Sequence, residues 1–282
     1  MAPYRLIAVD IDGTLLDSAA VLRPSVCRAL RRAVAAGLHV VLCTGRRYRT
    51  AYPIAQEMDL PLPLICHSGA LAKDTATHRT LFSLPIPRAD VGVLLDALSD
   101  FGLTPLVYSD SFDSGTDFYV ERGAALTPYH QDYLAKNAGN FAVVESLACD
   151  VPQPILQVCT FAERRELEAL RPRLRERLAG RTTCHLLSSA KYLGDFLEFQ
   201  AAGASKWGAL LTIAEARGIG PSAIAAIGDD ENDVSMLRDA GLGVAMGNAP
   251  YEVKGAADVV TAGNDEDGVV RVVDKLLEAR QG

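Results

Sequence analysis

Five short runs of apolar residues recur along the chain, and polar residues or a turn follow each of them. The runs cover residues 5–9, 38–43, 61–66, 223–228 and 242–245. Short runs that contain β-branched residues and end at turn signals are typical of buried strands in a parallel sheet. The pattern therefore predicts several strands of one buried sheet.

Between these runs the spacing of apolar residues changes to the helical period of three or four positions. The stretch 24–36 shows this spacing most clearly, in Val26, Ala29, Leu30, Ala33 and Val34. Similar patterns predict helices over 48–58, 205–216 and 267–279, the second with Ser205 as its N-cap. Because the order strand, helix, strand favours parallel pairing with right-handed crossovers, we expect an α/β fold with a Rossmann-like parallel-sheet core.

From about Leu84 the pattern changes to shorter strand-like segments that alternate with helices. It predicts strands within 103–110, 117–123, 154–161 and 182–189, and helices over 88–100, 126–136 and 163–178. This stretch has the size of an ordinary domain. We expect an α+β domain over 84–193, inserted into a parallel-sheet domain made of 1–83 and 194–282. The strand-like residues 196–200 would then belong to the resumed parallel sheet.

Composition narrows the class of protein. The chain has 282 residues, 49% of them hydrophobic, and a formal net charge of −7. An acidic balance disfavours nucleic acid as a partner, because binding the phosphate backbone requires a basic surface. No apolar run approaches the roughly 18 to 20 residues that cross a bilayer, and no signal peptide precedes the first strand. We therefore expect a soluble, cytoplasmic protein without membrane contact, whose six scattered cysteines are reduced thiols.

Two carboxylates follow the first apolar run. Asp10 and Asp12 stand at the end of the predicted strand, where open α/β sheets bind ligands. Residues i and i+2 of a strand point to the same side, so the two side chains begin on one face and repel each other. Mg²⁺ would offset this repulsion, since it binds one or two carboxylates together with phosphate oxygens. The simpler alternative is a turn at Asp12-Gly13, with Asp10 as an N-cap.

Three further loops reach the same edge of the predicted sheet, and each alone is weak evidence. In order, the four loops contain D-I-D-G-T, T-G-R, G-A-S-K and G-D-D-E-N-D. Together they resemble the four motifs of the haloacid dehalogenase-like (HAD) hydrolase superfamily. The likeness runs from Tyr4 to about Leu277 and is to the Cof-type branch, which carries a large α/β cap between the second and third motifs. The inserted domain matches that cap in length and position more than in residues.

The resemblance implies a phosphatase that uses Mg²⁺ as cofactor. Asp10 would be the nucleophile that becomes an aspartyl-phosphate, and Asp12 would be the general acid and base. Mg²⁺ would be held by the Asp10 side chain, the Asp12 main-chain carbonyl and Asp229. Asp233 would act through water or support the other ligands.

The resemblance also assigns the groups that hold the phosphoryl oxygens. Thr44, the Gly45 amide and Lys206 would bind these oxygens, and Asn232 would position either the phosphate or Lys206. Relatives often have Asn-Gly-Ala after the third strand, whereas this chain has Ser68 in place of the Asn. The shorter serine side chain puts in question the contact that the asparagine makes.

Several nearby residues have simpler interpretations. Lys206 alone would be an ordinary surface lysine, and only its place after G-A-S at a helix start favours a functional role. Asp230 and Glu231 are expected to be helix N-terminal acids that the helix dipole favours. Without a second histidine at useful spacing, His67 is not expected to bind metal.

The identity of the substrate is not readable from the core motifs. Six aromatic residues of the inserted domain favour ordinary packing over a leaving-group pocket: Tyr108, Phe112, Phe118, Tyr119, Tyr129 and Tyr133. The loop 110–117 is expected to be a solvated hairpin tip. We expect hydrolysis of a small phosphorylated metabolite, either a sugar phosphate or a phosphorylated cofactor. A phosphotransferase or phosphomutase with the same aspartyl-phosphate is the alternative, followed by a non-enzymatic phospho-aspartate switch; the oligomeric state stays open.

Overall fold

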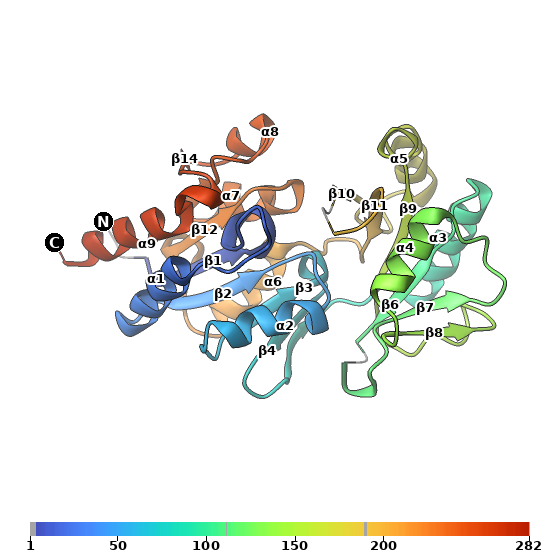
Figure 1. The fold of residues 1–282 in the computed structure, drawn as a ribbon, viewed down its shortest axis with the longest axis horizontal. Coiled ribbons are helices and arrows are strands. Elements are labelled where there is room, and N and C mark those ends of the chain that lie inside the picture. Colours follow the sequence, from blue (N-terminus) through green and yellow to red (C-terminus); the bar gives the residue numbers. More distant parts are fainter. Residues whose placement is uncertain (1–3, 111, 189–190, 282) are drawn as a thin grey trace. The chain divides into compact units, whose positions relative to one another are not determined.

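The computed structural model describes residues 4–110, 112–188 and 191–281 (Figure 1). The chain divides into two compact units, each with its own sheet. The first unit is built from residues 1–83 and 205–282, and the second from residues 84–204. The second unit is therefore an insertion between two halves of the first.

The sheet of the first unit contains eight strands of the described chain. In spatial order they are β14 (Val259–Val260), β13 (Leu242–Ala245), β12 (Ile224–Gly228), β1 (Leu6–Asp10), β2 (His39–Cys43), β3 (Pro63–Cys66), β4 (Leu71–Asp74) and β5 (Thr80–Ser83). All pairs from β14 to β3 are parallel, and the last two pairs are antiparallel. The predicted parallel-sheet core is confirmed, whereas the hairpin of β4 and β5 was not predicted.

The register of the central strands brings the motif loops to one edge of the sheet. Asp10, the last residue of β1, pairs with Cys43, the last residue of β2. On the other side of β1, Val9 pairs with Ile227 of β12. The strands are parallel, so the loops that begin after Asp10, Cys43 and Gly228 leave the sheet side by side.

Helices cover this sheet, and their apolar faces supply its core. They are α1 (Pro24–Ala35), α2 (Tyr48–Glu57), α6 (Lys206–Glu215), α7 (Val234–Asp239), α8 (Tyr251–Lys254) and α9 (Gly268–Gln281). Helices α1 and α9 pack against each other (Figure 1). Four of the five apolar residues predicted for the buried face of α1 are buried, whereas Val34 is 39% exposed.

The second unit combines one mixed sheet with three described helices. Its strands, in spatial order, are β10 (His185–Ser188), β11 (Asp195–Phe199), β9 (Ile155–Ala162), β6 (Leu106–Ser109), β7 (Phe118–Glu121) and β8 (Phe141–Val144). The helices are α3 (Arg88–Asp100), α4 (Pro128–Lys136) and α5 (Arg164–Leu178). Only β7 and β8 pair in parallel within this described sheet. The last residue of the strand predicted within 182–189, Ser189, lies outside the described residues.

Strand β11 lies in the sheet of the second unit. It pairs antiparallel with both β9 and β10. The expectation that residues 196–200 belong to the parallel sheet is therefore wrong. Leu197 and Phe199 are fully buried in the apolar core of the second unit, which explains the placement. The first unit resumes at Ser205.

Aromatic rings pack together inside the second unit. The Phe118 ring centroid lies 5.2 Å from that of Tyr108 and 5.4 Å from that of Tyr133. Such pairs add to the stabilisation that burial provides. The interpretation of these aromatic residues as packing is confirmed for this cluster. In the predicted hairpin tip 110–117, Ser111 lies outside the described residues.

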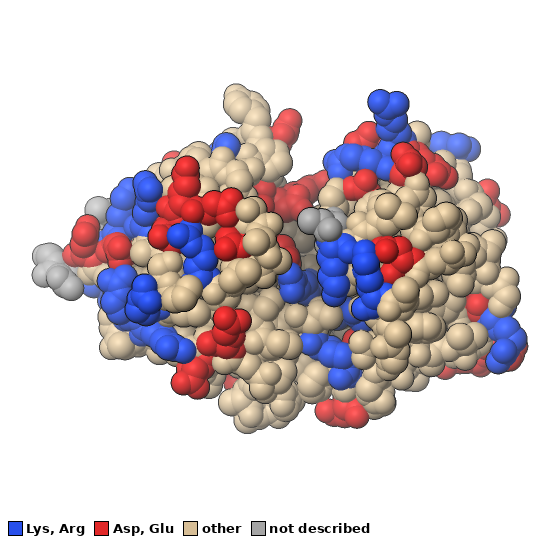
Figure 2. Space-filling view, in the orientation of Figure 1, with Lys and Arg blue, Asp and Glu red and all other residues tan. Residues whose placement is uncertain are grey.

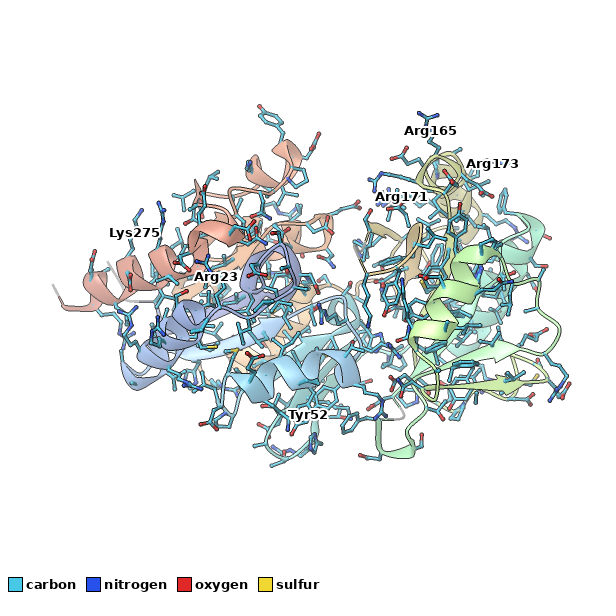
Figure 3. All side chains as sticks on the ribbon, in the orientation of Figure 1. Arg23, Tyr52, Arg165, Arg171, Arg173 and Lys275 are labelled. Atoms are coloured by element: carbon cyan, nitrogen blue, oxygen red, sulfur yellow. The ribbon has the colours of Figure 1, made fainter. Side chains whose placement is uncertain are left out.

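Helix α5 carries charges of both signs on its exposed surface. Figure 2 shows Lys or Arg and Asp or Glu side chains interspersed over this helix, and Arg164 forms an ion pair with Glu168 at 2.9 Å. Arg165, Arg171 and Arg173 project from α5 in different directions (Figure 3). The exposed face of α5 is therefore charged and solvated, whereas Leu167, Leu174 and Leu178 on its other face are buried.

Two further predictions concern the whole chain. All six cysteines are free thiols, and only Cys149 is exposed. No helix within residues 4–110, 112–188 and 191–281 combines the length and apolar character needed to cross a membrane.

Candidate active site

Three carboxylates meet at the edge of the parallel sheet. Asp10 ends β1, Asp229 follows β12, and Asp233 lies one turn further along the same loop. One carboxylate oxygen from each lies within 4.8 Å of the other two. Asp10 and Asp233 are buried, and Asp229 is partly exposed. The strand register accounts for this meeting, since β1 and β12 are neighbours that point the same way.

Lys206 joins two of these carboxylates from the start of α6. Its Nζ donates to Asp10 Oδ1 at 2.6 Å and to Asp233 Oδ1 at 2.7 Å. The side chain is only 1% exposed. The preceding residue, Ser205, is the predicted N-cap and accepts a hydrogen bond from the Gly208 amide. Lys206 is thus a buried partner of the acidic loops and not a surface lysine.

Burial, together with the crowding of like charges, raises the pKa values of the Asp10 and Asp229 carboxyls. Burial raises the pKa of Asp10 well above its usual value, the Asp233 charge adds to this, and Lys206 opposes it. Burial, followed by the Asp233 charge, raises the pKa of Asp229 to about 7. For Lys206, burial lowers the pKa, but the Asp10 and Asp233 carboxylates outweigh burial and raise it. The ammonium therefore stays charged and only partly compensates the cluster.

Asp233 also holds its own loop together. Its Oδ2 accepts hydrogen bonds from the backbone amides of Asp229 and Asp230, both at 3.0 Å. With Oδ1 bound to Lys206, both oxygens of Asp233 have partners in the protein. The Asp230 side chain accepts from the Glu231 amide and begins the short turn Glu231–Asp233. The expectation that Asp230 is an N-terminal acid is confirmed.

The side chain of Asp12 points to a different partner. Arg46 donates two hydrogen bonds to the Asp12 carboxylate, from Nε to Oδ2 at 2.7 Å and from Nη2 to Oδ1 at 2.5 Å. The Asp12 side chain is 54% exposed and does not join the cluster of three carboxylates. The predicted pair of carboxylates on one face therefore separates after the strand ends, and Arg46 holds Asp12 where water can reach it.

Gly13 permits this separation. Its φ of +77° lies in the left-handed region, and a Cβ atom at this position would lie 2.1 Å from Asp229 Oδ2. A side chain here would therefore displace Asp229 in addition to straining the backbone. The loop that follows Asp12 fits closely over Asp229 because residue 13 has no side chain.

Two residues that the sequence reasoning did not select hold Asp229 in place. Thr14 Oγ1 donates to Asp229 Oδ1 at 2.7 Å. Asn248 Nδ2 donates to the Gly13 carbonyl at 2.8 Å and to Asp229 Oδ2 at 3.3 Å. The signal for Thr14 was its place in D-I-D-G-T. For Asn248 it was an amide in a turn directly after a parallel strand.

The residues predicted to bind phosphate lie in the neighbouring loops. Thr44 is buried, and its Oγ1 accepts a hydrogen bond from the Arg46 amide at 3.1 Å. Gly45 lies between them and is partly exposed. Asn232 is 8% exposed, and its Nδ2 donates to Ser68 Oγ at 3.1 Å. His67 is buried beside Ser68 and is not part of the acidic cluster.

The donor set suits a hard divalent cation. Mg²⁺ prefers oxygen ligands, and Asp10 and Asp229 each offer a carboxylate oxygen to the same small volume. The raised pKa values of both carboxyls express the cost of burying these anions and of bringing them together, and a bound cation would offset that cost. The arrangement therefore combines a buried carboxylate, a buried ammonium and a candidate cation site at the end of one strand.

Comparison with known proteins gives a consistent result over the whole chain. A family model described as haloacid dehalogenase-like hydrolase matches residues 7–273. The pyridoxal phosphate phosphatase YbhA of Escherichia coli is 30% identical over 95% of this chain and 97% of its own length. The 5-amino-6-(5-phospho-D-ribitylamino)uracil phosphatase YitU of Bacillus subtilis is 31% identical over 98% of each chain.

A solved structure of the same family matches in three dimensions. The crystal structure of a haloacid dehalogenase-like hydrolase from Bacteroides thetaiotaomicron superposes with a TM-score of 0.77. It is 29% identical in sequence, and the match covers 97% of this chain and 99% of that one. Fold and sequence thus point to the same family.

Proposed function

The chain belongs to the haloacid dehalogenase-like hydrolases, and we propose that it is a Mg²⁺-dependent phosphatase that cleaves a small phosphorylated metabolite through an aspartyl-phosphate. The observation that carries the proposal is the set of the buried Asp10, Asp233 and Lys206 together with the partly exposed Asp229. Phosphoryl transfer needs an aligned nucleophile together with positive charge around the transferred group. This set offers a nucleophile, an ammonium and a cation site within a few ångströms.

Asp10 is the proposed nucleophile. In the first step a carboxylate oxygen of Asp10 attacks phosphorus, and the bond from phosphorus to the leaving oxygen breaks. The leaving oxygen takes the bonding electron pair and a proton from Asp12. In the second step water gives a proton to Asp12 and attacks the same phosphorus. The bond to Asp10 then breaks, which releases inorganic phosphate and restores the carboxylate.

The position of Asp12 supports its proposed role as acid and base. Arg46 holds its carboxylate outside the cluster of three aspartates. A proton carrier there can exchange protons with water and stays apart from the charges that surround Asp10. Arg46 is therefore proposed to orient Asp12.

Asp10 and Asp229 are proposed to hold Mg²⁺, together with the Asp12 main-chain carbonyl. When bound, Mg²⁺ would neutralise charge on the phosphoryl oxygens and keep the Asp10 carboxylate ionised. Asp233 is proposed to support the site through Lys206 and the loop amides, since both of its oxygens already bind protein groups. Lys206, Thr44 and Gly45 are proposed to bind the phosphoryl oxygens.

Named relatives indicate the class of substrate. YbhA is a phosphatase of pyridoxal phosphate, and YitU is a phosphatase of 5-amino-6-(5-phospho-D-ribitylamino)uracil. Both compounds are small phosphate monoesters. We propose that this enzyme hydrolyses a compound of that class, either a phosphorylated cofactor or precursor, or a sugar phosphate.

The test measures phosphate release from these two compounds and from a panel of sugar phosphates. Each is assayed with Mg²⁺ and with EDTA, for wild type, Asp10→Asn and Asp274→Asn. Asp274 pairs with Arg32 on the surface, so its variant makes the same chemical change away from the site. Release should require Mg²⁺ and fall at least about a thousandfold in Asp10→Asn alone.

Product analysis separates hydrolysis from the alternatives. Appearance of an isomeric phosphate in place of free phosphate would show a phosphomutase. A phosphorylated Asp10 that persists for minutes would support a switch. Full activity of Asp10→Asn would contradict the proposed mechanism.

A further inference from the structure

We propose that Ser68 is a positioning residue, whose hydroxyl orients the Asn232 amide so that its free end faces the phosphoryl group. The proposal rests on the phosphoryl site of the proposed function and goes beyond it. Ser68 belongs to the turn His67–Gly69, called here the 67–69 turn, which follows β3.

The backbone of this turn is unusual. His67, Ser68 and Gly69 have φ values of +50°, +52° and +103°. Left-handed conformations at two consecutive residues other than glycine are strained. Such strain persists only where surrounding contacts fix the conformation, and it is concentrated at functional sites.

The contacts that fix the turn come from the proposed phosphate loops. The His67 amide donates to the Arg46 carbonyl and the Ser68 amide to the Thr44 carbonyl, both at 3.1 Å. A Cβ atom on Gly69 would lie 2.1 Å from the Ser205 carbonyl oxygen. The turn therefore touches the loop of Thr44 on one side and the start of α6, directly before Lys206, on the other.

The Ser68 side chain makes the third connection, to the acidic loop. Asn232 Nδ2 lies 3.1 Å from Ser68 Oγ. Within the described chain, Asn232 Oδ1 is buried and has no hydrogen-bond partner. A buried carbonyl oxygen without a partner destabilises the folded state, so this atom is expected to meet a ligand or to exchange places with Nδ2.

Turning the amide by 180° gives each end a partner. Ser68 Oγ can donate as well as accept, so it would then donate to Oδ1. The NH₂ group would occupy the buried position that Oδ1 has here, where it could donate to an anion. Phosphoryl oxygens accept hydrogen bonds, and Asn232 stands next to Asp233, which shares Lys206 with Asp10. Phosphate therefore favours the turned amide, and Ser68 is the partner that accommodates it.

The experiment measures binding of inorganic phosphate in the presence of Mg²⁺ by titration calorimetry. The variants are Ser68→Ala, Ser68→Gly, Asn232→Ala and the double variant Ser68→Ala with Asn232→Ala. Alanine removes the hydroxyl and keeps the backbone strain, whereas glycine removes the hydroxyl and relieves the strain. Ser25→Ala is the matched control, because Ser25 Oγ donates to Asp267 Oδ1 at 2.7 Å away from the site.

The hydroxyl is expected to determine the result. Ser68→Ala and Ser68→Gly should both weaken phosphate binding about 3- to 10-fold, the range for one neutral hydrogen bond. The double variant should bind no more weakly than Asn232→Ala, because Ser68 acts through the amide. Ser25→Ala should bind phosphate as wild type does. If Ser68→Ala fails to fold, Ser68→Gly carries the test.

Three results would overturn the inference. They are unchanged phosphate binding in Ser68→Ala, restored binding in Ser68→Gly, and losses that multiply in the double variant. Hydrolysis assays run in parallel keep the two proposals apart. A wild type that binds phosphate through Ser68 but hydrolyses no ester would contradict only the proposed function. A wild type that hydrolyses esters, together with Ser68 variants that bind phosphate as wild type does, would contradict only this inference.

Discussion

A single lysine side chain sets the charge balance of the candidate site. Lys206 lies between Asp10 and Asp233, with its ammonium within 2.7 Å of both. The carboxylates have lost most of their contact with water, so their remaining stabilisation comes from this ammonium and from the backbone amides of the acidic loop. Removing one member of such a set leaves buried charge without a partner.

Lys206→Met should therefore be strongly destabilising, although methionine has a similar length. We expect a loss of about 3 to 5 kcal/mol in the free energy of unfolding at pH 7.5 without metal. The loss should shrink toward pH 5, because the raised pKa values of Asp10 and Asp229 favour the uptake of protons by these two carboxyls as the pH falls. Urea unfolding at both pH values measures it.

Lys275→Met is the control for this substitution. Lys275 is exposed on α9 (Figure 3), and the same change there should alter the unfolding free energy by less than about 0.5 kcal/mol. Equal stability of Lys206→Met and wild type at pH 7.5 would contradict the account of the buried charges.

At this scale the sequence predicted which residues meet but not how they touch. Asp10 and Asp229 meet because they end neighbouring parallel strands, and that follows from the order of elements. Two contacts depend on side-chain directions in separate loops. They are the hydrogen bonds from Arg46 to Asp12 and the hydrogen bond from Asn232 to Ser68. No periodicity in the chain encodes those directions.

At the scale of elements, loops far apart in the sequence hold each other. The turn after β13 reaches the first motif loop through Asn248, which binds both the Gly13 carbonyl and Asp229. Groups that orient a metal ligand commonly affect metal affinity nearly as much as some ligands do. This turn is therefore expected to act on the cation site from outside it.

Asn248→Ala should weaken Mg²⁺ binding about 10- to 100-fold, measured by titration calorimetry. Asn264→Ala is a close control, because the Asn264 side chain donates to the Leu16 carbonyl and not to Asp229. Its Mg²⁺ affinity should stay within about threefold of wild type. Equal affinities for the two variants would assign Asn248 a purely structural role.

Long apolar patterns predicted elements better than short ones did. The strands β1, β2, β3, β12 and β13 and the helices α1, α3, α5 and α6 lie close to their predicted ranges, whereas the two-residue strand β14 was not predicted. The strands β4 and β5 have four residues each, too few for alternation to be distinctive. The sequence of β11, DFLEF, does not alternate and fits a strand of either sheet. Its pairing with β9 and β10 determines the sheet to which it belongs.

At the scale of the molecule, each unit has a hydrophobic core of its own. The sequence predicted two domains from the change of pattern near Leu84. The predicted return to the first unit, at residue 194, comes before the observed one at Ser205, because the residues of β11 do not indicate which sheet the strand joins. The acidic cluster belongs entirely to the first unit, so cation binding should stabilise that unit.

Mg²⁺ should stabilise the first unit increasingly as the pH rises. Without metal, the pKa of Asp229 is about 7, above its unfolded value of 3.8, because of burial and then the Asp233 charge. The folded state thus retains a proton that the unfolded chain releases, and metal-free stability falls between about pH 4 and pH 7. Mg²⁺ binds the ionised form and offsets this loss.

Hydrogen exchange with Mg²⁺ and with EDTA, corrected for intrinsic rates, measures this effect by region. Added protection should appear in residues 4–83 and 205–281 and be larger at pH 7.5 than at pH 5.5. Residues 84–204 should show little change. Protection that is equal in both units, or larger at pH 5.5, would contradict the assignment of the cation site to these carboxylates.

The acidic cluster also has a consequence for the order of events during turnover. When ionised, three carboxylates and one ammonium leave two negative charges uncompensated, and a divalent cation cancels them. A phosphate ester that arrives before the cation meets a repulsive field, whereas one that arrives afterwards meets a neutral pocket with donors. Kinetics should therefore be sequential, with the cation as the leading reactant and the ester second.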